Sequence, residues 1–238
     1  MKTKACEKLI VALDTASLKQ VKGLLRELEG VVCFYKIGFE LFSAHGWEAV
    51  DLVRRGGRRV FLDLKLHDIP HTVARTAAVI CEHKIDMFNV HALGGIEMMR
   101  EARKKAEAYT KNKKRRPKLL AVTLLTSHTP QFMSKDLGSK RSLEDEVLHL
   151  ARCARKAGLD GVVSSPQEIA LLRKNFPQDF LIVTPGIRPQ GASKGGQKRT
   201  LGPREAFERG ADFVVIGRPI TESPNPRGAA SSIISLIR

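Results

Sequence analysis

Short apolar runs rich in β-branched residues alternate along the whole chain with longer runs whose apolar residues recur every three or four positions. The short runs are typical of buried strands and the longer ones of amphipathic helices. Eight such pairs predict strands at Lys8 to Asp14, Val31 to Ile37, Arg59 to Lys65, Asp86 to His91, Leu119 to Leu125, Gly161 to Ser164, Phe180 to Thr184 and Phe213 to Gly217. This alternation indicates βα units around a parallel sheet.

Several polar residues and glycines predict where the helices begin and end. Ser17 is suited to cap a helix that runs to Glu29. A second helix is predicted to begin at Ser142, because the segment from Ser142 to Asp145 resembles a capping box. Ser165 is followed by a proline, which predicts a helix from Pro166 to Asn175. Gly30 and Gly158 stand where the preceding helices should stop.

Eight repeats without a break in composition predict an α/β fold, a closed (β/α)₈ TIM barrel that forms a single domain over residues 1–238. An open doubly wound sheet would need a glycine-rich phosphate loop after an early strand, and Val11 to Thr15 contains no glycine. In a barrel the chemistry collects at the carboxyl ends of the strands. Asp14, Lys36 and the Asp63/Lys65 pair fall there.

The composition predicts a soluble, cytoplasmic protein with one large core. The chain has 238 residues, of which 42% are hydrophobic, and it has no run near the roughly 18 to 20 apolar residues of a membrane span. The cysteines are scattered, without metal-finger or C-x-x-C spacing, so we expect reduced, buried thiols at Cys6, Cys33, Cys81 and Cys153.

The net charge of +16, from 41 basic and 25 acidic residues, raises the question of an anionic partner. The densest basic run, Lys111 to Lys118, lies between a helix and a strand, so in a barrel it sits at the amino-terminal rim, away from the chemistry. It lacks interleaved aromatic residues, which make up only 5% of the chain. We therefore expect a solvated basic loop and no nucleic-acid site.

The segment Phe61 to Thr72 places charged residues in an otherwise apolar strand. Side chains alternate along a strand, so Asp63 and Lys65 project together. Buried charges survive only if they are paired, hydrogen-bonded or part of a working site. Asp68, just past the strand, adds a second carboxylate. A structural salt bridge inside the barrel is the alternative interpretation.

Two segments near the end of the chain have anion-binding character. Gly217 and Arg218 follow the eighth strand and precede a helix, where backbone amides and a guanidinium can hold phosphate. Thr184 to Gly191 opens into a glycine-rich, basic stretch from Ala192 to Arg199, which we expect to act as a mobile lid.

With these motifs the chain resembles the orotidine 5′-monophosphate decarboxylase family over nearly its whole length. The matching segments are Leu9 to Asp14, Tyr35 to Gly38, Phe61 to Lys65, Asp68 to Pro70 with Thr72, Leu125 to Ser127, Thr184 to Arg188, Gln190 with Gly191, and Val215 to Arg218. The Asp-x-Lys-x-x-Asp pattern is shared with related magnesium-dependent sugar-phosphate decarboxylases. Lys36 favours the orotidine 5′-monophosphate decarboxylase family, because the sugar-phosphate decarboxylases usually carry a carboxylate at this position.

The resemblance implies the roles of individual residues. Lys36, Asp63, Lys65 and Asp68 would form an alternating charged array. Asp68 and Thr72 would come from the neighbouring subunit of a homodimer, so that the active sites are shared. The substrate-binding residues would be Asp14 and Lys36 at the ribose hydroxyls, Thr72 at the ribose, Ser127 at the pyrimidine, Gln190 between base and phosphate, and Arg188, Gly217 and Arg218 on the phosphate side.

The implied reaction is decarboxylation of orotidine 5′-monophosphate to uridine 5′-monophosphate in pyrimidine synthesis, without cofactor or metal. Lys65 would stabilise the carbanion at C6 and then protonate it. His67 and His71 could suggest a metal site, but no third ligand is evident nearby. The alternatives are a magnesium-dependent sugar-phosphate decarboxylase, a basic nucleic-acid-binding protein and a catalytically silent phosphate-binding barrel.

Overall fold

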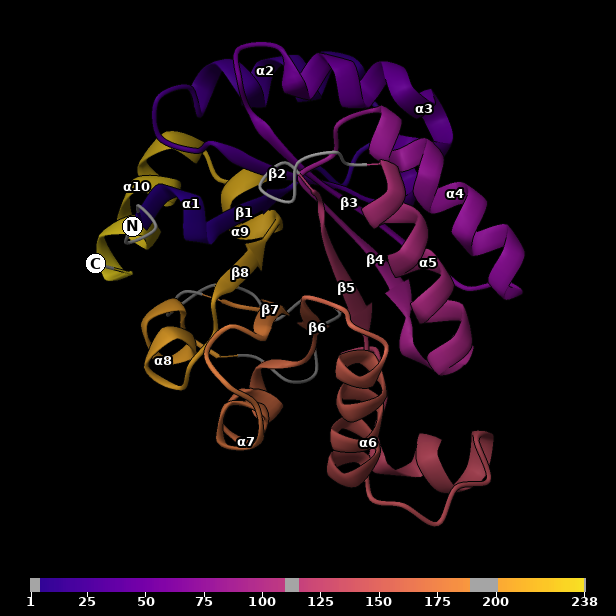
Figure 1. Cartoon of the computed structure of the whole chain (residues 1–238). Coiled ribbons are helices and arrows are strands. Elements are labelled where there is room, and N and C mark those ends of the chain that lie inside the picture. Colours follow the sequence, from indigo (N-terminus) through magenta and orange to yellow (C-terminus); the bar gives the residue numbers. More distant parts are fainter. Residues whose placement is uncertain (1–4, 110–115, 189–200, 238) are drawn as a thin grey trace.

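The computed structural model describes residues 5–109, 116–188 and 201–237. Its strands pair in parallel, each with the next along the chain, and the eighth pairs with the first (Figure 1). They are β1 (Leu9–Ala12), β2 (Phe34–Ile37), β3 (Arg59–Leu66), β4 (Met87–His91), β5 (Lys118–Val122), β6 (Gly161–Val163), β7 (Leu181–Pro185) and β8 (Phe213–Ile216). The predicted (β/α)₈ barrel is confirmed.

Helices alternate with the strands and surround the barrel (Figure 1). The longer ones are α2 (Leu18–Glu27), α3 (Phe39–Arg54), α4 (Pro70–Glu82), α5 (Gly95–Tyr109), α6 (Leu143–Lys156), α7 (Ile169–Asn175), α8 (Pro203–Glu208) and α10 (Pro226–Leu236). Short helices or turns are α1 (Ala5–Lys8), η1 (Ala92–Gly94), η3 (Phe132–Asp136), η4 (Pro166–Glu168) and α9 (Arg218–Thr221). None of the described helices is long and apolar enough to cross a membrane.

The predicted helix caps are present. The side chain of Ser17 accepts a hydrogen bond from the Gln20 amide, and Ser142 accepts one from the Asp145 amide. Ser165 caps η4, a 3₁₀ turn that leads into α7, so the helix predicted from Pro166 begins as this tighter turn. Gly30 and Gly158 adopt φ angles of 74° and 83°, the left-handed conformation that ends a helix.

Two predicted strands end more than one residue earlier than expected at their carboxyl ends. β1 ends at Ala12, not Asp14, and β5 ends at Val122, not Leu125. The chain leaves the sheet at these points, which places Asp14 and Leu125 on loops around the mouth of the barrel. The shortened strands therefore supply residues to the site described below.

Apolar side chains fill both the inside of the barrel and the space between strands and helices. The inner cluster is Ile10, Ala12, Phe34, Phe61, Met87, Leu120, Val122, Val163, Val183 and Val215. At the amino-terminal end, the Arg59 guanidinium carbon lies 4.2 Å from the centre of the Phe34 ring, and Phe213 packs edge-on against that ring. The packed interior confines the cavity to the carboxyl ends of the strands.

Carboxylates at the amino-terminal ends of β4, β6 and β8 bind the preceding strand. Asp86, Asp160 and Asp212 accept the backbone N–H groups of Val60, Leu119 and Ile182 at 2.9, 2.9 and 2.7 Å. Asp160 also pairs with Arg116, which is 13% exposed. The expected solvated basic loop is thus wrong at this residue, because a buried carboxylate holds the arginine in place.

The expectation of four buried thiols is also only partly correct. Cys81 is buried, whereas Cys6, Cys33 and Cys153 are half-buried. The sulfur atoms of Cys6 and Cys33 lie 3.7 Å apart, because α1 packs its cysteine against the start of β2. Burial, with the Cys6 contact, raises the pKa of the Cys33 thiol to about 12.

Candidate active site

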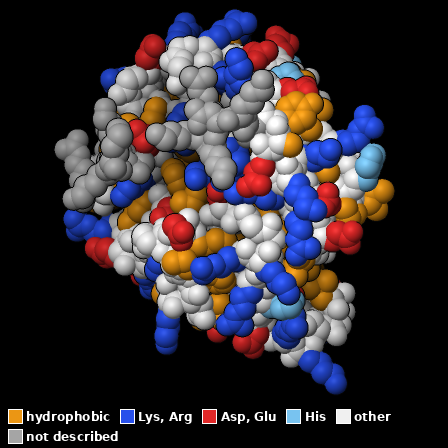
Figure 2. Space-filling model, in the orientation of Figure 1, with side chains coloured by type: hydrophobic (Ala, Val, Ile, Leu, Met, Phe, Trp, Pro, Cys, Tyr) orange, Lys and Arg blue, Asp and Glu red, His pale blue; other side chains and the backbone are white. Residues whose placement is uncertain are grey.

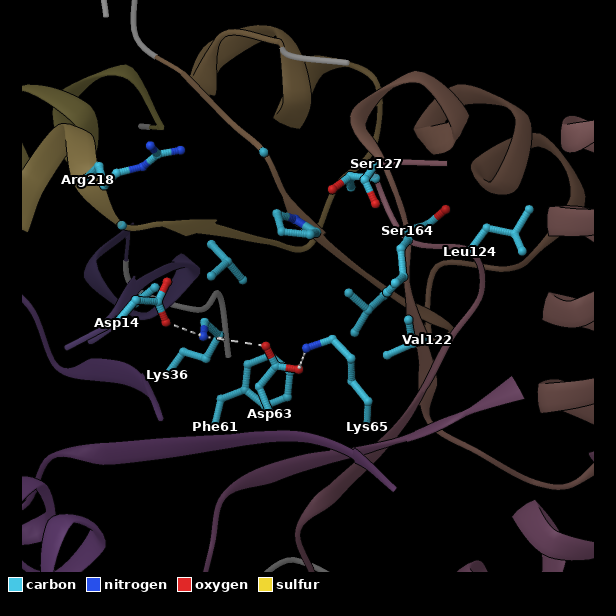
Figure 3. Close-up of a pocket in the computed structure, with 18 of the residues that line it drawn as sticks. Asp14, Lys36, Phe61, Asp63, Lys65, Val122, Leu124, Ser127, Ser164 and Arg218 are labelled. Carbon is cyan, nitrogen blue, oxygen red and sulfur yellow. Dashed lines mark hydrogen bonds and ion pairs between the residues drawn. The ribbon is translucent and has the colours of Figure 1, made fainter. Parts of the chain in front are cut away.

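A cavity of about 380 Å³ opens at the carboxyl ends of the strands (Figure 3). Residues from β1, β2, β3 and from β5 to β8, with the loops that follow them, form its wall. They are Ala12, Asp14, Lys36, Phe61, Asp63, Lys65, Val122, Leu124, Leu125, Thr126, Ser127, Val163, Ser164, Pro185, Gly186, Arg188, Val215, Gly217 and Arg218. The cavity therefore collects most of the site residues expected from the sequence.

Four side chains along one wall form a continuous array of alternating charge (Figure 3). Lys36 Nζ lies 2.8 Å from an Asp14 oxygen and 3.5 Å from an Asp63 oxygen. The other Asp63 oxygen lies 2.8 Å from Lys65 Nζ. The order carboxylate, ammonium, carboxylate, ammonium lets each inner charge contact an opposite charge on both sides.

The two inner members of the array are the most buried. The side chains of Lys36 and Asp63 are 11% and 13% exposed. Burial alone would raise the pKa of Asp63, but the ammonium groups of Lys36 and Lys65 and hydrogen bonds from Lys65 and Asn89 hold it below its ordinary value. Burial alone would lower the pKa of Lys36, but Asp63 and Asp14 raise it. Both groups are therefore charged at neutral pH.

Asn89 is a site residue that the sequence reasoning missed. It lies on β4, is fully buried, and donates from Nδ2 to Asp63 at 2.7 Å. Its Oδ1 accepts the backbone N–H of Lys65, also at 2.7 Å. The sequence signal was an amide in an otherwise apolar strand that follows the charged third strand.

The rest of the wall is largely apolar and also carries the hydroxyl groups of Thr126, Ser127 and Ser164. Val122, Val163 and Val215 come from inward-facing strand positions. Ser164 directly follows β6, and Ser127 lies on the segment that follows β5 (Figure 3). A flat ring with polar edges fits between such an apolar wall and the charged array.

A third part of the cavity carries two guanidinium groups. Arg188 follows β7, and Arg218 with Gly217 follows β8. Burial, together with the positive charge of Arg218, lowers the pKa of Arg188. The buried Nε of Arg188 has no hydrogen-bond partner among the described residues. An anion held between the two arginines would relieve their repulsion and accept this hydrogen bond.

Two residues expected at the site, Asp68 and Thr72, are not part of this cavity. Asp68 is exposed, and its carboxylate accepts the backbone N–H of its own neighbour Ile69 at 2.7 Å. Thr72 is exposed on α4. Gln190, with the predicted lid from Ala192 to Arg199, lies outside the described residues. In one chain the array thus lacks the second carboxylate expected beside Lys65.

The histidines near the mouth contact one another and do not gather with carboxylates. The rings of His67 and His91 stack with their centres 5.4 Å apart. Burial, with the charges of His67, His128 and Lys65, lowers the pKa of His91 to about 4, so it is neutral at pH 7. Over residues 5–109, 116–188 and 201–237, no three His, Cys, Asp or Glu residues are grouped so that they could hold a metal ion.

Fold and site together define a TIM-barrel protein that is built to place an anionic ligand against a fixed ammonium group. The model of the orotidine 5′-phosphate decarboxylase / HUMPS family matches residues 7–233, and the chain belongs to this family. The family resemblance predicted from the sequence is confirmed.

Similar proteins and structures agree with this assignment. A protein from Geobacter metallireducens named orotidine 5′-phosphate decarboxylase is 48% identical over 98% of this chain and 97% of its own. One of the same name from Lactococcus lactis subsp. cremoris SK11 is 44% identical over 94% and 95%. A crystal structure of orotidine 5′-phosphate decarboxylase from Lactobacillus acidophilus is 38% identical, with a TM-score of 0.86 over 97% of this chain and 98% of its own.

Proposed function

We propose that this chain decarboxylates orotidine 5′-monophosphate to uridine 5′-monophosphate with Lys65 as the group at the reacting carbon. The observation that carries the proposal is the Lys65 ammonium, held 2.8 Å from Asp63 at the wall of the mouth cavity. Family membership and the names of the relatives support the same reaction.

The chemistry requires a fixed cation. When the bond between C6 and the carboxylate breaks, carbon dioxide leaves and the electron pair stays on C6, where the ring cannot delocalise it well. An oriented ammonium stabilises this charge without reorganisation. Lys65 then transfers a proton from Nζ to C6, and solvent restores the ammonium. Asp63 keeps Lys65 directed at the carbon throughout.

Different residues of the cavity bind the ribose, the pyrimidine and the phosphate of the substrate. Asp14 forms one end of the array and Lys36 is bound to it, so that ribose hydroxyls can bind at this end. Ser127 lies beside the apolar wall, within reach of the polar edge of a pyrimidine. Phosphate fits between Arg188 and Arg218, with Gly217 allowing close approach. Gln190 and Thr72 remain sequence-based assignments.

We propose that the reaction uses neither cofactor nor metal, because the donor set disfavours a divalent cation. Lys36 Nζ lies between the Asp14 and Asp63 carboxylates, so its charge occupies the space where these oxygens could converge on a metal. The related magnesium-dependent chemistry would need that space. This contact is the structural reason to prefer the nucleotide reaction.

A homodimer with shared sites would complete the array. Phe39, Ile69 and Leu93, which follow β2, β3 and β4, are 56%, 66% and 40% exposed. Large apolar side chains gathered near one part of the rim favour a subunit interface. Asp68 is adjacent to Ile69, is exposed and does not line its own cavity, as expected of a residue that completes a neighbour's site.

The shared site can be tested by complementation. Mixed dimers of Lys65→Ala and Asp68→Ala chains contain one site with both residues intact, so activity should return to roughly a quarter of the wild-type value, since half the dimers are mixed and each has one working site of two. Activity is measured after co-refolding, with dimer formation checked by sedimentation. Well-folded mixed dimers without activity would show that Asp68 does not cross the interface.

We propose that the basic surface does not bind nucleic acid. Lys and Arg side chains are spread over the face shown in Figure 2 and are interspersed with acidic ones. Such a distribution suits general attraction of small anions better than a continuous binding track. The four cysteines are free thiols, which supports a location in the cytoplasm.

Loss of the absorbance of orotidine 5′-monophosphate tests the proposed function directly. Wild-type protein should consume the nucleotide equally well with and without a chelator, and Lys65→Ala should lose at least about 10³-fold in kcat. Lys174→Gln, an exposed change on α7, is the matched control and should retain full activity. Turnover that appears only with added magnesium would contradict the mechanism.

A further inference from the structure

We propose that Asn89 is a positioning residue that fixes the direction of the Lys65 ammonium by holding both the Lys65 backbone and the Asp63 carboxylate. The inference rests on the proposed role of Lys65 as the group at the reacting carbon. Asn89 itself does not line the cavity. It acts through the two residues it binds.

The first observation is an irregularity in the sheet beside the site. Phe61 and Leu62 pair with Met87 and Phe88, but the next pair joins Leu66 to Val90. β3 therefore advances four residues while β4 advances two, and Asp63 to Lys65 bulge out of the ladder. Bulges of this kind re-aim side chains next to active sites.

The second observation is the backbone conformation of Lys65. Its φ angle is 44°, in the left-handed region that favours glycine and that a lysine rarely adopts. A residue stays in such a conformation only when its surroundings hold it there. The backbone N–H of Lys65 donates a hydrogen bond to Asn89 Oδ1 at 2.7 Å. The Asn89 side chain thus supplies the hydrogen bond that the irregular ladder does not.

The third observation is the hydrogen bond made by the nitrogen end of the Asn89 side-chain amide. Asn89 Nδ2 donates to Asp63 Oδ1 at 2.7 Å, and the Lys65 ammonium donates to that same oxygen at 2.8 Å. The second Asp63 oxygen faces Lys36 at 3.5 Å. With one oxygen fixed by Asn89, the carboxylate plane is set, and so is the point at which Lys65 is anchored.

Only an amide of this length meets both demands. Its acceptor must face an N–H and its donor must face a carboxylate, and asparagine offers one of each in a rigid plane. Aspartate would keep the acceptor but place a second negative charge against Asp63. Alanine would leave the Lys65 N–H and an Asp63 oxygen without this partner.

The test compares Asn89→Ala and Asn89→Asp with a matched control at the other end of the same strand pair. Asp86 makes an equivalent side-chain bond from the start of β4 to the Val60 N–H of β3, far from the cavity. Asp86→Ala therefore removes a similar link without touching Lys65. Thermal unfolding of each variant identifies a temperature at which all the variants are folded, and the assays are run at that temperature.

At that temperature, both Asn89 variants should lose about 10²-fold in kcat while KM changes less than about threefold, since the misdirected ammonium affects the reacting carbon and not substrate binding. Asp86→Ala should keep its kcat. If Asn89→Ala does not fold, the nearly isosteric Asn89→Asp carries the same prediction.

The inference is overturned if the Asn89 variants keep kcat within about threefold of wild type, or if Asp86→Ala loses as much as they do, which would indicate a purely structural role. Wild-type and Lys65→Ala proteins are measured in the same assay. An inactive wild type, or an active Lys65→Ala, would refute the proposed function itself and is thus distinguishable from a failure of the Asn89 inference.

Discussion

At the scale of single residues, Gly38 shows how closely the array is packed. A Cβ at this position would lie 2.7 Å from Lys36 Nζ and 3.4 Å from an Asp14 oxygen. Its φ angle of −99° is open to any residue, so backbone strain does not require the glycine. The space is needed by the ammonium group, which bends back to contact both carboxylates.

Gly38→Ala should therefore impair binding and leave the fold intact. The added methyl displaces the end of a flexible lysine, which costs little stability, so Tm should change by less than about 3 °C. Because the Lys36 ammonium is shifted at the proposed ribose site while it stays paired with Asp63, KM should rise about tenfold, equivalent to about 1.4 kcal/mol. Steady-state kinetics and thermal unfolding check both halves of this prediction. An unchanged KM would show that Lys36 does not contact the substrate.

His91 gives a residue-scale prediction of pH dependence. Its pKa is about 4 in the fold against an ordinary 6.5, mainly because of burial, so the unfolded chain binds the extra proton first as pH falls. Stability is therefore complete above about pH 6.5 and decreases from there toward pH 4. Allowing for partial exposure of the ring, His91 accounts for about 1 to 2 kcal/mol of that loss.

The measurement is thermal unfolding of wild type and His91→Gln between roughly pH 4 and 8. The free energy of unfolding of wild type minus that of His91→Gln should decrease as the pH falls through this window, because glutamine has no proton to gain. A parallel pH dependence in both proteins would assign the acid sensitivity to other groups.

At the scale of elements, the sequence predicted the order and type of the elements better than their local geometry. Each predicted strand corresponds to an observed one, because apolar runs and caps are local signals. The bulge in β3 could not be predicted, since it depends on Asn89, 24 residues away from Lys65. Alternation placed Asp63 and Lys65 on one face, yet it could not reveal that Lys65 leaves regular strand geometry to get there.

The three carboxylates before β4, β6 and β8 were likewise invisible as a group in the sequence. Asp160, whose side chain is 9% exposed, binds Arg103, Arg116 and the Leu119 amide. Asp160→Ala should destabilise the protein by about 3 kcal/mol, because two arginines lose their buried partner. This corresponds to a decrease in Tm of roughly 6 to 12 °C.

The same variant separates stability from catalysis. Asp160 lies at the amino-terminal end of the barrel, opposite the cavity, so kcat and KM should be unchanged at a temperature where the variant is folded. Circular dichroism on heating gives Tm, and the absorbance assay gives the kinetics. A large loss of kcat in folded protein would contradict the division of the barrel into a stabilising and a catalytic end.

At the scale of the whole molecule, the net charge of +16 acts on the substrate before it binds. Lys36, Lys65, Arg188 and Arg218 outnumber Asp14 and Asp63 in the cavity wall. A phosphate-bearing nucleotide is therefore attracted to the mouth, and salt screens this attraction over about 10 Å at 0.1 M. We expect kcat/KM to fall several-fold when ionic strength rises from about 0.02 to 0.5 M, with kcat nearly constant.

Two charge variants locate the source of this attraction. Arg218→Ala removes a positive charge at the mouth and should reduce the slope of log kcat/KM against ionic strength as well as kcat/KM itself. Lys174→Gln removes the same charge from the last turn of α7, at the amino-terminal end of the barrel, and should leave the slope unchanged. Equal slopes in the three proteins would mean that the overall charge, and not the mouth, attracts the nucleotide. A flat salt dependence in wild type would assign the excess of basic residues to some purpose other than substrate capture.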